Sequence, residues 1–230
     1  MAGALALLGA TSPFERWAYR AGAGASRKFL AYGISILGLW ALTAVAVWIY
    51  GWARLLSAPE PTVPTIVAPV LVPVVAAFFV FALLPLVQSL RGLAWRRAYA
   101  AAIRREFARI PGFIPNNAAE RAVWIVLSLT AGICEEVLLR GFLIRFLHGG
   151  PLNLSLAAAL TLSCLCFGLG HLYQGLKGVI TTAIAGFAFG ILFLVSGSLI
   201  PCIVLHALID LQIIYVMRPI PEQAAATGTA

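Results

Sequence analysis

The chain has 230 residues, of which 62% are hydrophobic and 10% are charged, and its formal net charge is +8. In soluble domains about a quarter of all residues are charged, so this composition excludes an ordinary soluble domain. The basic residues stand between apolar stretches and form no polar module of their own, which argues against nucleic acid as a partner. We expect membrane lipid to surround most of the chain.

Six apolar stretches, each long enough to cross a hydrocarbon core about 30 Å thick, follow one another along the chain. They cover residues 29–53, 64–90, 122–147, 152–172, 178–196 and 198–217. An earlier apolar run, Ala4–Ala10, is short and has its basic residues after it, so we expect no signal peptide there. The sequence therefore predicts an all-α integral membrane protein, a bundle of about six transmembrane helices.

The segment from Gly92 to Ile110, between the second and third stretches, has the pattern of an amphipathic helix. Its apolar residues approximate one face, with the arginines largely elsewhere: Leu93, Trp95, Tyr99, Ile103 and Phe107. Such a helix lies at the membrane surface, where anionic lipid attracts its basic side. A solvated basic linker is the alternative interpretation.

Lys and Arg concentrate before the first stretch and between the second and third, whereas Arg54 lies on the opposite side of the membrane. The positive-inside rule then predicts that both termini are cytoplasmic, in a bacterial inner membrane if the source is bacterial. We divide the chain into an N-terminal segment with two spans (1–90), a core with the interfacial helix and four spans (91–217), and a disordered tail (218–230).

Ionisable residues inside the spans are the best indicators of function, because each costs about 2.5–3.5 kcal/mol near the bilayer centre. Of eight acidic residues, three lie within apolar stretches: Glu135, Glu136 and Asp210. Two of the three histidines, His171 and His206, lie within such stretches or at their ends. Either histidine alone is better explained as a hydrogen-bonded core residue. Their occurrence together with the acids favours a functional site.

The spacing of these residues predicts how they meet. Glu136 and Arg140 are four residues apart, share a helix face and can form an ion pair. His206 and Asp210 have the same spacing, as do Phe167 and His171. Counted along the spans, His171 lies nearer the cytoplasm than Glu135 and His206. At 1.5 Å per residue the difference in depth is roughly 10 Å. This offset favours a cavity that opens to the cytoplasm.

Small residues accompany the ionisable groups and predict close helix packing. Gly132 precedes the acidic pair, Gly168 and Gly170 precede His171, and Gly186 and Gly190 form a small-xxx-small pair. Generic membrane packing is a sufficient explanation for the last two. All four cysteines lie in apolar stretches and are interpreted as small buried hydrophobes. A thiol nucleophile at Cys134 is disfavoured, because its two neighbouring carboxylates oppose the thiolate.

Three motifs stand in order on successive apolar stretches: Glu-Glu-x-x-x-Arg at 135–140, Phe-x-x-x-His at 167–171 and His-x-x-x-Asp at 206–210. Together they resemble the motif set of the CAAX-protease and bacteriocin-processing (CPBP, or ABI) family, which includes prenyl-protein endopeptidases and bacterial self-immunity proteins. The resemblance covers about residues 91–217. One departure is Asp210, where the family commonly has Asn.

The resemblance implies hydrolysis of peptide bonds of membrane-associated or lipidated peptides. Glu135 would act as general base, His171 would help to hold the water, and His206 and Asp210 would stabilise the oxyanion. Glu136, paired with Arg140, would be the structural member of the acidic pair.

The sequence does not decide whether the site holds a metal ion. Glu135, His171, His206 and Asp210 could instead hold a divalent ion such as Zn²⁺, as in a metalloprotease, because two histidines and a carboxylate form an acceptable catalytic set. A proton-coupled transporter and a non-catalytic scaffold or immunity protein are the alternative functions. The sequence sets neither the substrate nor the oligomeric state.

Overall fold

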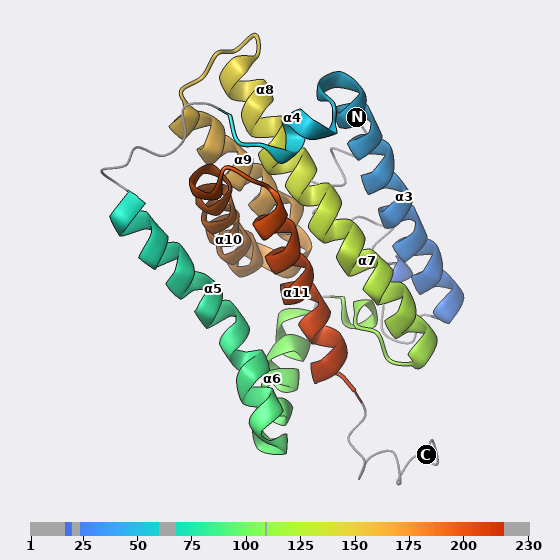
Figure 1. Ribbon diagram of the computed structural model, residues 1–230. Coiled ribbons are helices and arrows are strands. Elements are labelled where there is room, and N and C mark those ends of the chain that lie inside the picture. Colours follow the sequence, from blue (N-terminus) through green and yellow to red (C-terminus); the bar gives the residue numbers. More distant parts are fainter. Residues whose placement is uncertain (1–16, 20–23, 60–67, 109, 219–230) are drawn as a thin grey trace.

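The computed structural model describes residues 17–19, 24–59, 68–108 and 110–218. These residues form helices and no strand, with one isolated bridge between Ser57 and Ser198. Figure 1 follows the chain through its α-helices. Their bounds are α3 (Ala25–Tyr50), α4 (Trp52–Leu56), α5 (Ala68–Arg91), α6 (Leu93–Glu106), α7 (Ala118–Glu136), α8 (Ile144–Gly149), α9 (Leu156–Gly170), α10 (Gly175–Ser196) and α11 (Ile200–Val216).

The all-helical prediction is confirmed, and each of the six apolar stretches overlaps a helix. Four helices in the described residues are long and apolar enough to cross a membrane, at Ala25–Tyr50, Ala68–Arg91, Ala118–Gly149 and Leu172–Ser196. The other two, α9 and α11, are apolar but have only 15 and 17 residues. The predicted count of six spans is therefore not confirmed by helix length. The start of the second stretch, the Ala4–Ala10 run and all but the first residue of the predicted tail lie outside the described residues.

The third span is one continuous helix with a change of pitch in its middle. α7 ends at Glu136, a π-helical segment, η2 (Val137–Leu143), follows at once, and α8 completes the span. This span lies at the centre of the bundle, with α3 against one side and α11 against another (Figure 1). The acidic pair is thus carried by a helix that packs between α3 and α11.

Close approaches between helices occur where the sequence has glycine. A Cβ at Gly132 would lie 3.0 Å from the backbone nitrogen of Ala207, so α7 and α11 touch at this point. A Cβ at Gly168 would lie 2.6 Å from the carbonyl oxygen of Val179, at the contact of α9 with α10. Both glycines therefore have a specific packing role, as the small-residue pattern predicts.

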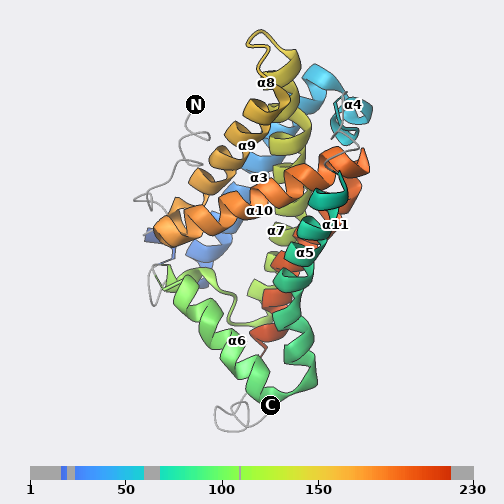
Figure 2. The same cartoon turned by 90° about the vertical axis from the view of Figure 1, so that its left-hand side faces the viewer.

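The amphipathic helix predicted for Gly92–Ile110 is present as α6, which ends four residues earlier than expected. Ile103 and Phe107 are buried, whereas Leu93 and Trp95 at the other end are exposed. Only part of the apolar face therefore packs on protein. Figure 2 shows α6 and α5 forming a V at one end of the molecule, and Arg96 of α6 donates to the carbonyl oxygens of Val216 and Arg218.

The segment between α6 and α7 is fixed by a buried ion pair and a ring cluster. Lys28 of α3 contacts Glu120 of α7 at 2.9 Å, with both side chains 5% exposed. The Tyr32 hydroxyl donates to the carbonyl oxygen of Phe113 in the short 3₁₀ turn η1 (Pro111–Phe113), and the Phe113 ring packs on Trp124. These contacts tie α3 and α7 together at the end of the bundle that carries α6.

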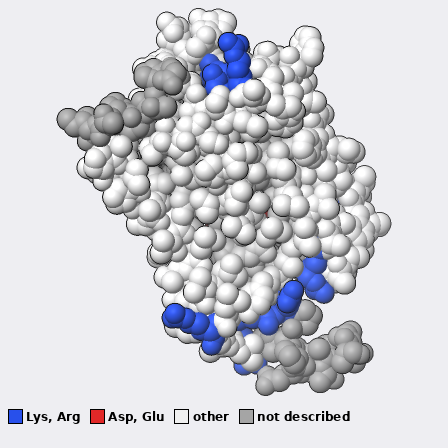
Figure 3. Space-filling view, in the orientation of Figure 1, with Lys and Arg blue, Asp and Glu red and all other residues white. Residues whose placement is uncertain are grey.

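Figure 3 shows how charge is distributed over one face of the molecule. Lys and Arg gather at the two ends of this face, and a broad band between the ends has none. Many large apolar side chains are exposed on the helices, among them Leu37, Trp48, Val70 and Phe81. An apolar band between charged ends is the surface expected of a protein that spans a bilayer.

Replacement of Gly168 by Ala is expected to destabilise the protein by about 1–3 kcal/mol, because the new methyl group forces α9 away from the Val179 carbonyl. Unfolding of the purified chain in detergent, followed by circular dichroism, measures the loss. Gly38→Ala in α3 is the matched control, since a Cβ there meets nothing within 4 Å. Equal stability of the Gly168 and Gly38 variants would contradict the close contact.

Candidate functional site

An ion pair with no access to solvent forms the centre of the site. Arg140 Nη1 donates to Glu136 Oε1 at 3.0 Å, and the two side chains are 2% and 0% exposed. A second guanidinium nitrogen, Nη2, donates to the Gly186 carbonyl oxygen of α10 at 3.3 Å. The pair predicted from the four-residue spacing is therefore present, and it also joins the third span to α10.

His206 joins this pair from α11. Its Nδ1 lies 2.7 Å from Glu136 Oε1, the same oxygen that receives Arg140. Since a carboxylate only accepts, Nδ1 carries the proton of this bond. The other carboxylate oxygen, Oε2 of Glu136, is buried and has no hydrogen-bond partner among the described residues. Glu136 thus fixes both the ring plane of His206 and the direction of its second nitrogen.

The second nitrogen of His206 faces the other two acids. Nε2 lies 3.8 Å from Glu135 Oε2 and 3.8 Å from Asp210 Oδ2. Both distances exceed those of a direct hydrogen bond and suit a small polar species held between the groups. Glu135 and Asp210 are 18% and 34% exposed, in contrast to the sealed Glu136. The open side of the site is therefore the side of Glu135, Asp210 and Nε2.

His171 adjoins this group without a hydrogen bond to it among the described residues. It caps the C-terminal end of α9, and its Nδ1 lies 2.9 Å from the Phe167 carbonyl oxygen. The Phe167 ring makes edge contacts with His171 at 4.9 Å and with His206 at 5.8 Å between centroids. One aromatic ring thus contacts both histidines, and the offset expected for His171 stays a prediction.

Two aromatic rings enclose the charged centre, and the sequence indicated only one of them. The Arg140 guanidinium lies over Phe167 at 4.4 Å and over Phe189 of α10 at 5.5 Å. Phe189 also stacks on the His206 imidazole, with centroids 5.3 Å apart. Phe189 was missed because one Phe in an apolar helix carries no local signal. The available hint was that Phe189 follows Gly186 by three residues, because residues with this spacing lie on the same face of a helix.

The π-helical segment η2 is a second feature that the sequence did not indicate. It begins directly after the acidic pair and contains Arg140. The Leu139 carbonyl oxygen accepts the backbone N–H of Ile144, and Ser163 of α9 donates to the same oxygen at 2.8 Å. A Cβ at Gly141 would lie 2.6 Å from the Leu55 carbonyl oxygen, so α4 packs closely on the other side. Segments of this type often occur at functional sites.

The residues that the sequence offered as metal ligands do not meet as a metal site in the described part of the chain. No group of three His, Cys, Asp or Glu side chains there has the arrangement that holds a metal ion. His171 in particular contacts Phe167, and its Nδ1 is engaged with a backbone oxygen.

The four cysteines have no disulfide partner, and three of them are buried: Cys134, Cys164 and Cys202. Cys166 is exposed on α9, so the expectation that all four are buried is wrong for this one. Cys134 is fully buried beside Glu135. No thiol in this set faces the open side of the site together with a base.

Comparison with known protein families matches the part of the chain that carries the site. Residues 117–212 match a family model described as "Type II CAAX prenyl endopeptidase Rce1-like". The match begins at Asn117, which caps α7, and includes every residue of the site described above. No curated protein and no solved structure matches the chain. The N-terminal helices α3 to α6 lie outside the matched range.

Replacement of Arg140 by Met is expected to cost about 3–5 kcal/mol of stability, because Glu136 then remains buried without its counter-charge. Lys177→Met, which breaks the exposed pair with Glu106, is the matched control and should cost less than about 1 kcal/mol. Unfolding in detergent compares the two. Similar losses would contradict the central role assigned to Glu136 and Arg140.

Proposed function

We propose that the chain is an intramembrane endopeptidase whose general base is Glu135, since residues 117–212 match the Rce1-like model of type II CAAX prenyl endopeptidases. The observation that supports this role is the geometry around His206. One nitrogen of the ring is held by a sealed carboxylate, and the other faces Glu135 on the open side. A fixed imidazole opposite a free carboxylate is an arrangement that can activate water.

The proposed reaction begins with a water between Glu135 and His206 Nε2. Two hydrogen bonds of about 2.8 Å can span the 3.8 Å that separates these atoms. Glu135 takes a proton from the water while the water oxygen attacks the carbonyl carbon of the peptide bond. When the tetrahedral intermediate collapses, the C–N bond breaks and the proton on Glu135 passes to the leaving amine.

His206 is proposed to stabilise the oxyanion as an imidazolium. In that form Nδ1 donates to Glu136 and Nε2 donates into the space beside Glu135 and Asp210. A donor held in place before the reaction stabilises developing negative charge efficiently. Glu136 and Arg140 are positioning residues in this scheme, since Glu136 holds the imidazole, Arg140 holds Glu136, and both are sealed from the open side.

Asp210 and His171 are proposed to complete the polar lining of the site. Asp210 lies against Nε2 and is the most exposed acid of the group, so it can orient His206 and the incoming water. His171 contacts the same Phe167 ring as His206 and would hold the water or the substrate backbone. As a carboxylate, Asp210 donates no hydrogen bond, so the Asn commonly found there in the family would contribute differently.

A Zn²⁺-dependent reaction is the alternative to this scheme. Metal analysis of the purified chain distinguishes the two. One tightly bound zinc per chain, with activity lost to a chelator and restored by zinc, would favour the metal. Activity that persists in a metal-free preparation would favour Glu135 and His206 alone.

The substrates that we propose are peptides anchored in the membrane or modified by a lipid. The family description names prenyl endopeptidases, and the site lies among helices with apolar outer surfaces. We further propose that both termini face the cytoplasm, in a bacterial inner membrane if the source is bacterial. The basic residues of α6 and of the segment before α3 support this orientation.

Glu135→Gln is expected to lower peptide hydrolysis by about 10²–10⁴-fold, because an amide cannot take the proton from water. The measurement is cleavage of a lipid-modified peptide by the full chain in proteoliposomes. It is paired with a comparison of protein N-termini in cells that carry either form at matched expression. N-termini that disappear with the variant identify the substrates.

Cys134→Ala is the matched control and should retain activity, because the neighbouring thiol has no proposed role. Loss of activity in the Cys134 variant with retention in the Glu135 variant would overturn the assignment of the base. Identical N-terminal profiles with unchanged ion flux would favour a scaffold or immunity protein. A pH-dependent flux altered by Glu135→Gln would favour a transporter.

A further inference from the structure

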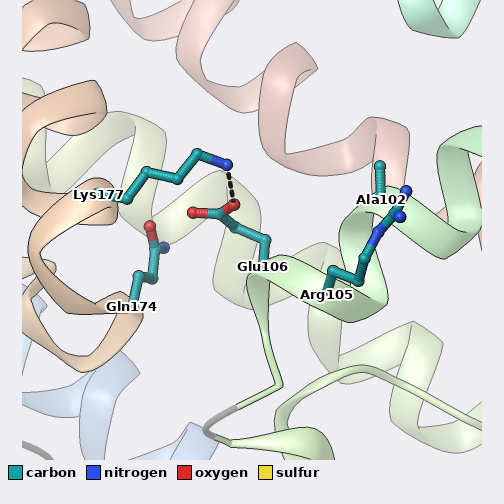
Figure 4. Close-up of a pocket in the computed structure, with 5 residues that line it drawn as sticks. All are labelled: Ala102, Arg105, Glu106, Gln174 and Lys177. Carbon is teal, nitrogen blue, oxygen red and sulfur yellow. Dashed lines mark hydrogen bonds and ion pairs between the residues drawn. The ribbon is translucent and has the colours of Figure 1, made fainter.

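A cavity of about 400 Å³ lies outside the proposed active site, where the end of α6 meets the beginning of α10. Figure 4 shows the residues that line it, with Lys177 and Glu106 turned toward each other across the opening. The lining consists of Ala102, Arg105, Glu106, Gln174 and Lys177. Nothing in the proposed hydrolysis uses these side chains.

The charged groups of the cavity are accessible and exchangeable. Lys177 Nζ contacts Glu106 Oε2 at 3.0 Å, but the lysine side chain is 79% exposed. Exposed ion pairs of this kind are weak, so another anion can replace the carboxylate on Lys177. Arg105, the residue before Glu106, is exposed as well; its side chain extends away from Lys177 in Figure 4, so it must turn to share a ligand with Lys177. The cavity therefore offers two cationic donors and one acidic competitor.

An exposed apolar stripe leads away from the cavity along α10. Its members recur every three or four residues on the outer side of the helix: Leu176, Ile180, Ile184 and Phe187. Leu176, next to Lys177, is 71% exposed. On a helix long and apolar enough to cross a membrane, this stripe faces the hydrocarbon chains of lipid. A ligand that combines an anionic head with apolar chains matches both features.

We propose that this cavity binds an anionic phospholipid, with the phosphate between Arg105 and Lys177 and an acyl chain along the stripe of α10. The phosphate replaces Glu106 on Lys177 when the lipid binds. Arg and Lys are the usual partners of phosphate, and a basic amphipathic helix such as α6 is attracted to anionic head groups. A soluble phosphate would use the two cations but not the stripe, so lipid is the better match. This site is independent of the proposed hydrolysis.

Native mass spectrometry of the full chain in detergent, titrated with phosphatidylglycerol or phosphatidylcholine, tests the proposal. One phosphatidylglycerol is expected to bind at concentrations at which phosphatidylcholine does not. Arg105→Gln should weaken this binding at least about fivefold, whereas Arg104→Gln, which removes the neighbouring charge outside the cavity, should change it less than about twofold. Glu106→Gln should strengthen the binding, since it removes the competing carboxylate.

Each contrary result overturns a defined part of the proposal. Equal effects of the Arg104 and Arg105 variants would mean a diffuse attraction between α6 and anionic lipid, with no site. Weaker binding in Glu106→Gln would mean that the phosphate does not replace the carboxylate on Lys177. Displacement of phosphatidylglycerol by millimolar inorganic phosphate would mean a site for free anions. Unfolding curves of the unchanged chain and of the three variants show whether a variant has lost its structure. Stronger lipid binding by the Glu106 variant cannot result from misfolding, so this variant tests the site independently.

Discussion

A carboxylate sealed inside a membrane helix is the constraint on which the rest of the structure depends. Glu136 has no exposed surface, so its charge must be balanced by groups brought from elsewhere in the fold. Arg140 comes from the next turn and His206 from a helix seventy residues later, and both contact the same carboxylate oxygen. The third span, α10 and α11 are therefore fixed relative to one another by one oxygen atom and its partners.

The packing around this centre also sets the orientation of the His206 imidazole. Gly132 lets α7 touch the backbone of α11, one residue from His206, so the imidazole can reach Glu136. Phe189 supports the ring from one face. Because neither the helix spacing nor the ring plane can vary freely, Nε2 is turned toward Glu135. The adjacent glutamates therefore have different surroundings, one sealed and one partly open.

Much of the site could be predicted from the sequence, because the cost of an ionisable group in lipid singles it out. The ion pair of Glu136 with Arg140 and the approach of Asp210 to His206 followed from spacing alone. Phe189 and the π-helical segment could not be predicted in this way. The position of Phe189 depends on which face α10 turns to the centre. The π-helical segment depends on tertiary contacts, among them the second hydrogen bond that Ser163 of α9 donates to Leu139. The count of spans was the weaker fold prediction, since apolar runs at α9 and α11 are longer than their helices.

The two short helices have a consequence for the bilayer itself. At 1.5 Å per residue, α9 and α11 are about 22 Å and 26 Å long, shorter than a hydrocarbon core of about 30 Å. Such hydrophobic mismatch is relieved when lipid thins around the protein. If both helices cross the bilayer, such thinning would bring the aqueous boundary closer to His171, at the end of α9, and to His206, within α11. Host membranes with short acyl chains would then accommodate this chain with the least deformation.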